Sequence, residues 1–201
     1  MPVGATEQRD NAANQFQNPS NPNADYSNCG ADKRQNFVAS IIARSQFGGG
    51  SLKRALLNGW QVAPIISATT GTPFTVTSGT DRSLTGVLLD RPNLVGAPYK
   101  HTGAKTTWLD STAFAFKTPG TFGNIRPYAY YGPHYTNLDG AVTRFIPIHE
   151  ALAAQARAEC FNCLNHPNLS NPTSALNRAS FGQILSANTP RIIQLSVKLD
   201  F

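Results

Sequence analysis

Charge is scarce in this sequence. Charged residues make up 14% of its 201 residues, and glutamate occurs only at Glu7, Glu150 and Glu159. Typical soluble domains contain about 25% charged residues. The chain instead has 16 Gly and 14 Pro beside many Asn, Thr and Ser, which are typical of turns and long loops. This composition suits a protein whose outer surface meets lipid and whose loops are uncharged.

Long apolar runs are also missing. No stretch approaches the roughly 18 apolar residues of a transmembrane helix. The segment Met1–Arg34 is polar and lacks the apolar core of a signal peptide. At face value this indicates a cytosolic protein; for a protein of the cell envelope, it would make Met1 an internal or artificial start. The formal charge is +6, but basic residues pair only at Lys33-Arg34 and Lys53-Arg54, so we expect no nucleic-acid partner.

Signatures of catalysis are absent. The chain has no Gly-x-Ser-x-Gly elbow, phosphate loop or dinucleotide fingerprint, so we expect neither an enzyme nor a cofactor. His149 and Glu150 are adjacent, which does not place an acid and a base across a cleft, and we interpret them as turn residues. A hydrolase that uses one of the four His residues stays a remote alternative.

Cysteine is rare, with Cys29, Cys160 and Cys163 allowing one disulfide at most. The spacing Cys160-x-x-Cys163-x-x-His166 resembles half of a metal site. A fourth ligand is lacking, and along a strand the two cysteines would point to opposite faces. We therefore predict no metal site, and we interpret both cysteines as small apolar residues.

The end of the chain carries the clearest pattern. Residues 191–201 alternate between apolar and mostly polar side chains, as a strand with two different faces requires. Their length matches the roughly 9–11 residues that a tilted strand needs to cross a bilayer. An apolar face toward lipid and a terminal aromatic at the interface are typical of an outer-membrane barrel strand. The predicted lipid-facing and assembly-signal residues are Ile193, Leu195, Val197, Leu199 and Phe201.

Four earlier segments also read as long strands. They are 36–46, 57–77, 136–147 and 150–162. In the last of these, Ala and Glu also favour a helix over 150–160, which is a competing interpretation.

The connections between these strands alternate in length. Short links at 47–56, around Gly48–Gly50, and at 147–149 alternate with long stretches at 1–35, 78–135 and 166–190. Outer-membrane barrels have short periplasmic turns and long extracellular loops. If Phe201 ends at the periplasm, every long stretch is extracellular. Within the stretch 78–135, an aromatic cluster (Tyr128, Tyr130, Tyr131, His134 and Tyr135) predicts loop packing or an interfacial girdle rather than a sugar-stacking site.

These patterns predict an all-β fold. We expect an antiparallel meander that forms part of a transmembrane β-barrel with long extracellular loops, in the outer membrane and against its lipid. The expected organisation is a polar loop segment over 1–35 and a C-terminal barrel portion over 36–201. Five long strands cannot close a barrel, for which about eight is the practical minimum. The main alternative is a soluble or secreted β-sandwich that serves as a binding module.

An ordered series of short segments adds a resemblance to a known family. It includes Asn21–Tyr26, Asp32–Val38, Leu57–Val62, Thr70–Val76, Asp90–Gly96, Gly120–Asn124, Arg157–Asn168, Phe181–Ile184 and Pro190–Gln194. In this order they resemble the C-terminal barrel region of TonB-dependent outer-membrane receptors, closest to the acidobacterial type with a carboxypeptidase-regulatory-like domain. Cys160 and Cys163 depart from the apolar residues usual in that family.

The resemblance implies a receptor of about 22 strands, of which this chain would contain only the last few. It implies uptake of a small molecule or oligosaccharide at the cell surface, powered by an inner-membrane energising complex. The N-terminal barrel strands and the plug domain have no counterpart in this chain, so the resemblance makes them the missing partners.

Overall fold

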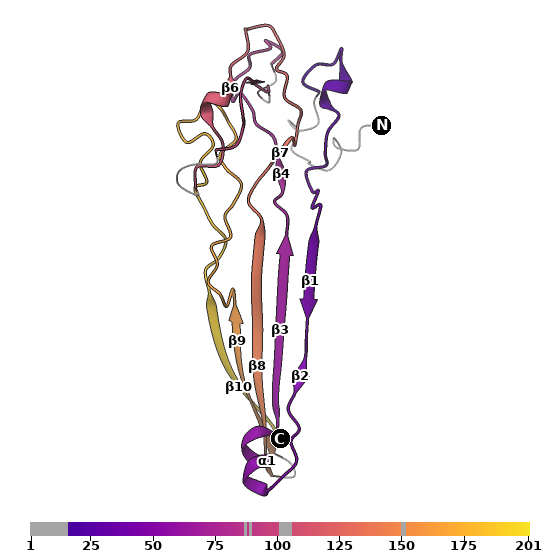
Figure 1. Ribbon diagram of the computed structural model, residues 1–201, viewed down its shortest axis with the longest axis vertical. Coiled ribbons are helices and arrows are strands. Elements are labelled where there is room, and N and C mark those ends of the chain that lie inside the picture. Colours follow the sequence, from indigo (N-terminus) through magenta and orange to yellow (C-terminus); the bar gives the residue numbers. More distant parts are fainter. Residues whose placement is uncertain (1–15, 87, 89, 101–105, 150–151) are drawn as a thin grey trace. The chain divides into compact units, whose positions relative to one another are not determined.

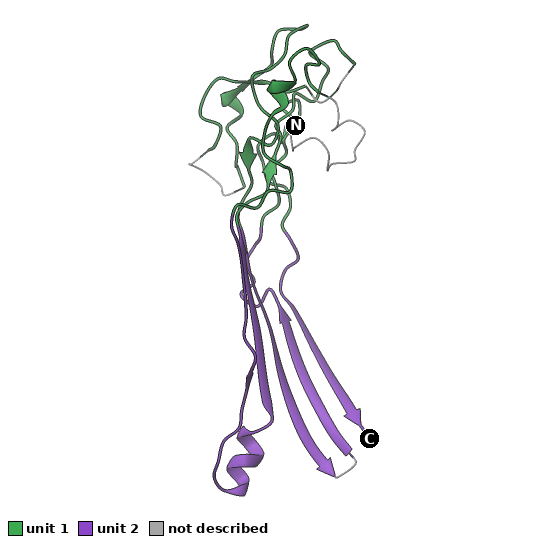
Figure 2. Ribbon diagram, turned by 90° about the vertical axis from the view of Figure 1, so that its right-hand side faces the viewer, with its two compact units in different colours: residues 1–34, 70–134, 169–187 green, residues 35–69, 135–168, 188–201 purple. Residues whose placement is uncertain are grey.

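A computed structural model describes residues 16–86, 88, 90–100, 106–149 and 152–201. Its internal contacts divide the chain into two compact units, coloured separately in Figure 2. Unit 1 consists of residues 1–34, 70–134 and 169–187, and unit 2 of residues 35–69, 135–168 and 188–201. The predicted division into a polar loop segment over 1–35 and a barrel portion over 36–201 follows the order of the chain rather than its internal contacts. It stays a prediction.

Unit 2 is an antiparallel sheet of six strands, with the order β1-β3-β8-β9-β10 and with β2 also paired to β3 (Figure 1). Its elements are β1 (Asn36–Ser40), β2 (Ala43–Arg44), α1 (Ser51–Leu57), β3 (Trp60–Thr69), β8 (Tyr135–His149), β9 (Leu152–Phe161) and β10 (Ile192–Asp200). Every neighbouring pair is antiparallel, which confirms the predicted all-β class. The sheet is not closed, because β1 and β10 lie at opposite ends of the strand order.

The predicted strands correspond well to the long strands of unit 2. The segment 36–46 is divided into β1 and β2, and both parts pair with β3. Pro64 explains the division: its carbonyl accepts from the Ile41 N–H at 3.2 Å, and a proline nitrogen on the same side has no hydrogen to donate. The helix alternative for 150–160 is wrong where the structure describes it, since Leu152–Phe161 is a strand.

Two other boundaries need correction. The predicted strand 57–77 ends at Thr69, and its continuation enters unit 1, where β4 (Pro73–Phe74) belongs to a separate sheet. The link expected at 47–56 contains the helix α1, because Leu, Lys, Arg and Ala over 52–57 favour helix. The tight turn expected near 147–149 is not found there: β8 runs to His149, which pairs with Leu152 and is a strand residue, and residues 150–151, including Glu150, lie outside the described residues.

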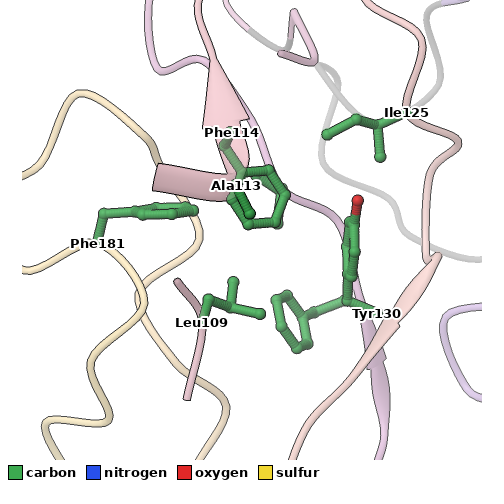
Figure 3. Packing of buried hydrophobic residues seen from close by; sticks show 8 residues of the cluster. Leu109, Ala113, Phe114, Ile125, Tyr130 and Phe181 are labelled. Carbon is green, nitrogen blue, oxygen red and sulfur yellow. The ribbon is translucent and has the colours of Figure 1, made fainter. Parts of the chain in front are cut away.

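Unit 1 has short elements around a buried core. The elements are η1 (Pro22–Asp25), β4 (Pro73–Phe74), β5 (Asn93–Leu94), η2 (Ser111–Ala113), β6 (Phe114–Ala115) and β7 (Tyr130–Tyr131). Figure 3 shows how the rings of the core meet. Phe114 contacts Tyr130 and Phe181 edge to face, with ring centroids 5.5 and 5.3 Å apart. The other core residues are Phe74, Val76, Leu109, Ala113 and Ile125.

The aromatic cluster before β8 therefore serves loop packing, at least at two of its positions. Tyr130 is only 4% exposed and belongs to the core of unit 1. Tyr131 stacks against the Arg34 guanidinium, 5.1 Å from the ring centroid. Its hydroxyl also accepts from Asn28 at 2.9 Å. Among the described residues, no helix is long and apolar enough to cross a membrane.

Candidate functional site: a two-faced sheet and the unit formed by its loops

The register of unit 2 separates its side chains into two faces. One row across the sheet joins Val62, Val142, Ala158 and Leu195, and the neighbouring row joins Gln61, Thr143, Arg157 and Ser196. Because successive residues of a strand point to opposite sides, the first row and its alternate neighbours form one face, called the apolar face below. The second row belongs to the opposite face, called the polar face.

The apolar face is exposed rather than buried. Ile193, Leu195, Val197 and Leu199 are 64%, 76%, 74% and 56% exposed. The strands of unit 2 contribute none of the buried hydrophobic residues of the described chain. A soluble sandwich buries such a face against a second layer, whereas a barrel turns it toward lipid.

The predicted strand residues lie as expected in position. Ile193, Leu195, Val197 and Leu199 share the apolar face of β10, beside Cys160, Ala158, Ala156 and Ala154 of β9. Phe201 follows the last strand and is fully exposed. Their role as lipid contacts and assembly signal remains a prediction.

The polar face holds two ion pairs, each within a single strand. Arg157 and Glu159 lie two residues apart on β9, with Nη2 and Oε1 separated by 2.6 Å. Lys198 and Asp200 make the same arrangement on β10, also at 2.6 Å. Both pairs are half-exposed, so water would compete with them. In a barrel this face lines the lumen.

Register also shows where the long connections begin. Asn36, Thr69 and Tyr135 are aligned across β1, β3 and β8, and Phe161 is aligned with Ile192. Residues 70–134 and 162–191 therefore leave the sheet at one end, as does the chain before β1. The connection with α1 leaves the sheet at the other end, where β8 ends at His149 and β9 begins at Leu152. The alternation of short and long connections expected from the sequence is thus a property of the structure.

Unit 1 is held together by two buried ion pairs in the motif Asp90-Arg91. Arg91 Nη1 lies 2.6 Å from Asp25 Oδ1, and Lys117 Nζ lies 3.1 Å from Asp90 Oδ2. All four side chains are less than 10% exposed. Burial lowers the pKa of Arg91, while the Asp25 carboxylate raises it. These pairs fasten the segments around 25 and 117 to the motif.

Further hydrogen bonds surround these two ion pairs. The backbone amides of Arg82 and Ser83 donate to Asp90 Oδ2 at 2.6 and 2.5 Å, and Arg91 Nε donates to the Ile125 carbonyl at 2.7 Å. A Cβ on Gly123 would lie 1.9 Å from the Arg91 carbonyl oxygen, so only glycine fits there. The short segments around Asp90 and Gly123 were recognised from the sequence but the ion pairs were not, because their partners lie far away in the chain.

The cysteine pattern has a local structural role. The chain leaves β9 through Asn162 and Asn165, both at positive φ. This exit brings the Cys163 thiol back to donate to the Cys160 carbonyl at 3.1 Å, so the expectation that the two residues point apart does not apply. Burial raises the pKa of Cys163 to about 11.

The structure brings no metal site together at these positions. Over residues 16–86, 88, 90–100, 106–149 and 152–201, no cluster of three His, Cys, Asp or Glu residues could hold a metal ion. His166 instead lies in the strand exit, where its backbone amide donates to Asn162 Oδ1 at 3.0 Å. None of the three cysteines, all of them described, forms a disulfide.

Comparison with known proteins agrees with the two-faced sheet. The family model described as an outer membrane beta barrel domain matches residues 3–194, which is nearly the whole chain. No curated protein and no solved structure was found to match. The match and the exposed apolar face together place the chain in the outer membrane. The chain belongs to the outer membrane beta barrel domain family.

Proposed function

We propose that this chain is the C-terminal portion of a TonB-dependent receptor that binds a small molecule or an oligosaccharide and takes it up at the cell surface. The observation that carries the proposal is the packed unit built from connections that all leave one end of the sheet. In outer-membrane barrels the long connections are extracellular. A folded extracellular unit offers a preorganised surface to a ligand, which bare flexible loops do not.

The open sheet supports the same proposal. The free edges of β1 and β10 would leave backbone N–H and C=O groups unpaired in lipid, at a cost of several kcal/mol each. Further barrel strands would pair both edges. A plug domain and an inner-membrane energising complex would then supply gating and energy, as the resemblance implies.

The first test reads the DNA on the 5′ side of the codon for Met1. The proposal expects an open reading frame that continues into more alternating strands and a plug domain. A stop codon and a ribosome-binding site directly upstream would contradict it.

The second test measures uptake in the host bacterium, with and without the gene. Labelled iron chelates and a labelled oligosaccharide series serve as the probes. We expect uptake of one probe to be lost in the deletion strain, restored by the intact gene and abolished by a protonophore. Gene-dependent uptake that continues in the presence of the protonophore would show a passive channel instead.

A further inference from the structure

We propose that α1 and the residues beside it form an interfacial anchor that binds the phosphate headgroups of the phospholipid leaflet at the short-turn end of the barrel. This anchor consists of Phe47, Leu52, Lys53, Arg54, Leu56 and Trp60. It lies outside the loops assigned to ligand uptake. The inference rests on the membrane placement of the sheet and is independent of the proposed receptor function.

The last turn of α1 contacts the end of the apolar face. Trp60 and Arg144 are register partners, and both belong to this face. Arg144 donates to the carbonyls of Ala55, Leu56 and Asn58, and Trp60 Nε1 donates to the Leu56 carbonyl at 3.0 Å. These bonds satisfy carbonyls at the C-terminal end of the helix, which have no partner inside it. The last turn of α1 is therefore fixed beside the lipid-facing surface.

Arg144 is an exception on this apolar face, and its contacts explain how it is tolerated. Its guanidinium stacks on the Trp60 ring, 5.0 Å from the centroid, while it caps the helix. A charged side chain among lipid-facing residues is costly at the bilayer centre and tolerated near the interface. Arg144 therefore marks the level of the interface, where Trp is also enriched.

The exposed side chains of α1 match a membrane surface. Leu52 and Leu56, four residues apart on one side of the helix, are 73% and 62% exposed, and Phe47 is 54% exposed. Lys53 and Arg54 are exposed on other sides. Apolar residues next to adjacent cations are the pattern of helices that lie in the headgroup region. Because the apolar face already meets lipid, this cluster continues an existing membrane contact.

The turn holds the helix in this position. Asn58 accepts from the Phe47 amide at 2.6 Å and donates to the Phe47 carbonyl at 3.1 Å. These two hydrogen bonds join the two ends of the connection that contains α1. The short connections of outer-membrane barrels are periplasmic, so the leaflet is the inner, phospholipid leaflet and not the surface lipopolysaccharide.

The depth of the anchor can be measured by fluorescence quenching. Bimane is attached at L52C in a background with C29S, C160A and C163A, and the full 201-residue chain is inserted into vesicles of phosphatidylcholine and phosphatidylglycerol brominated near the headgroup. L195C serves as the positive control for insertion, and L185C, at a residue of unit 1 that is 69% exposed, as the aqueous control. We expect quenching at position 52 close to that at 195 and well above that at 185.

The headgroup contribution is tested with K53Q/R54Q. Each cation near an anionic membrane surface contributes about 1 kcal/mol, so we expect this variant to bind phosphatidylglycerol vesicles about 10- to 30-fold more weakly. The matched control K100Q/R178Q removes two exposed cations from unit 1 and should change binding less than about threefold. Pure phosphatidylcholine vesicles should not distinguish the two variants.

Three results would overturn the inference. One is quenching at position 52 no greater than at 185 in a preparation where 195 is quenched. The other is equal binding of K53Q/R54Q and K100Q/R178Q to phosphatidylglycerol. The third is a difference between K53Q/R54Q and K100Q/R178Q on lipopolysaccharide vesicles but not on phosphatidylglycerol vesicles, which would reject the assignment to the phospholipid leaflet.

Discussion

The two units solve the problem of apolar side chains in opposite ways. Unit 1 buries Phe114, Tyr130, Phe181 and their neighbours in a core of its own. Unit 2 exposes nearly every large apolar residue of its strands, with Leu195 and Val197 about three-quarters exposed. A core that excludes water stabilises unit 1 in water. The sheet of unit 2 gains the same stabilisation only where lipid takes the place of a core.

The ion pairs of the two units differ in burial in the same way as their apolar side chains. In unit 1 the ion pairs Asp25–Arg91 and Asp90–Lys117 are buried and join distant segments. In unit 2 the pairs Arg157–Glu159 and Lys198–Asp200 are half-exposed and join residues two apart on one strand. Losing a partner should therefore be costly in unit 1, whereas in unit 2 the face of the sheet on which a charge lies should decide its effect.

The largest effect is expected for Lys117→Met in unit 1. The change removes the ammonium group but keeps most of the side-chain volume, and it leaves the Asp90 carboxylate buried without its cation. We expect a loss of about 3–5 kcal/mol in the free energy of unfolding. Urea unfolding followed by the fluorescence of Trp108, which packs against the core, measures this loss in a Trp60→Phe background.

Lys100→Met is the control for this prediction. Lys100 is exposed, and its substitution should change the free energy of unfolding by less than about 0.5 kcal/mol. Equal effects at positions 100 and 117 would show that the buried pair contributes nothing beyond surface charge.

The next effect compares the two faces of β10. Leu195→Arg places a cation on the apolar face, where we expect about 2–4 kcal/mol of destabilisation in the bilayer. Ser196→Arg places the same cation on the polar face, beside Arg157, and should cost much less. Urea unfolding from phosphatidylcholine vesicles, followed by β-sheet circular dichroism, measures both. A larger cost at 196 than at 195 would reverse the assignment of the faces.

The sequence predicted the sheet better than it predicted unit 1, for a physical reason. A strand with one lipid-facing side must alternate residue by residue, so 191–201 is recognisable from period two alone. The first predicted strand, 36–46, is divided because Pro64 on the neighbouring strand has no N–H to donate. This effect acts between strands and leaves no pattern within 36–46. The helix α1 was missed because the glycines at 48–50 suggested a simple turn.

Unit 1 was predicted as loops because its order comes from residues far apart in the chain. Arg91 pairs with Asp25 and donates to the Ile125 carbonyl, and these partners lie 66 and 34 positions away. Such contacts have no period. The motif at 90–93 and Gly123 were nevertheless recognised, and the structure gives a reason for each: two buried ion pairs and a backbone approach too close for a Cβ.

The smallest predicted effect concerns the response of unit 1 to alkaline pH. Burial raises the pKa of Tyr130 to about 12, whereas an unfolded chain gives tyrosine a pKa of about 10. Because the pKa is higher in the folded state, the neutral phenol contributes its full stability below about pH 10 and loses it as the pH rises toward about 12. The loss amounts to about 2–3 kcal/mol.

Tyr130→Phe should remove this part of the pH dependence, because phenylalanine keeps the ring in the core and cannot ionise. Urea unfolding monitored by Trp108 at about pH 8 and about pH 11 measures the difference between variant and parent, in which Tyr99 and Tyr128, whose pKa values burial also raises, are unchanged. Tyr26→Phe, at a tyrosine that is 58% exposed, is the matched control and should leave the pH dependence as it is. Equal losses of stability in the two variants between these pH values would show that ionisation of Tyr130 does not destabilise the core. The alkaline sensitivity of unit 1 would then come from groups other than Tyr130, and Tyr99 and Tyr128, whose pKa values burial also raises, would be the next tyrosines to replace.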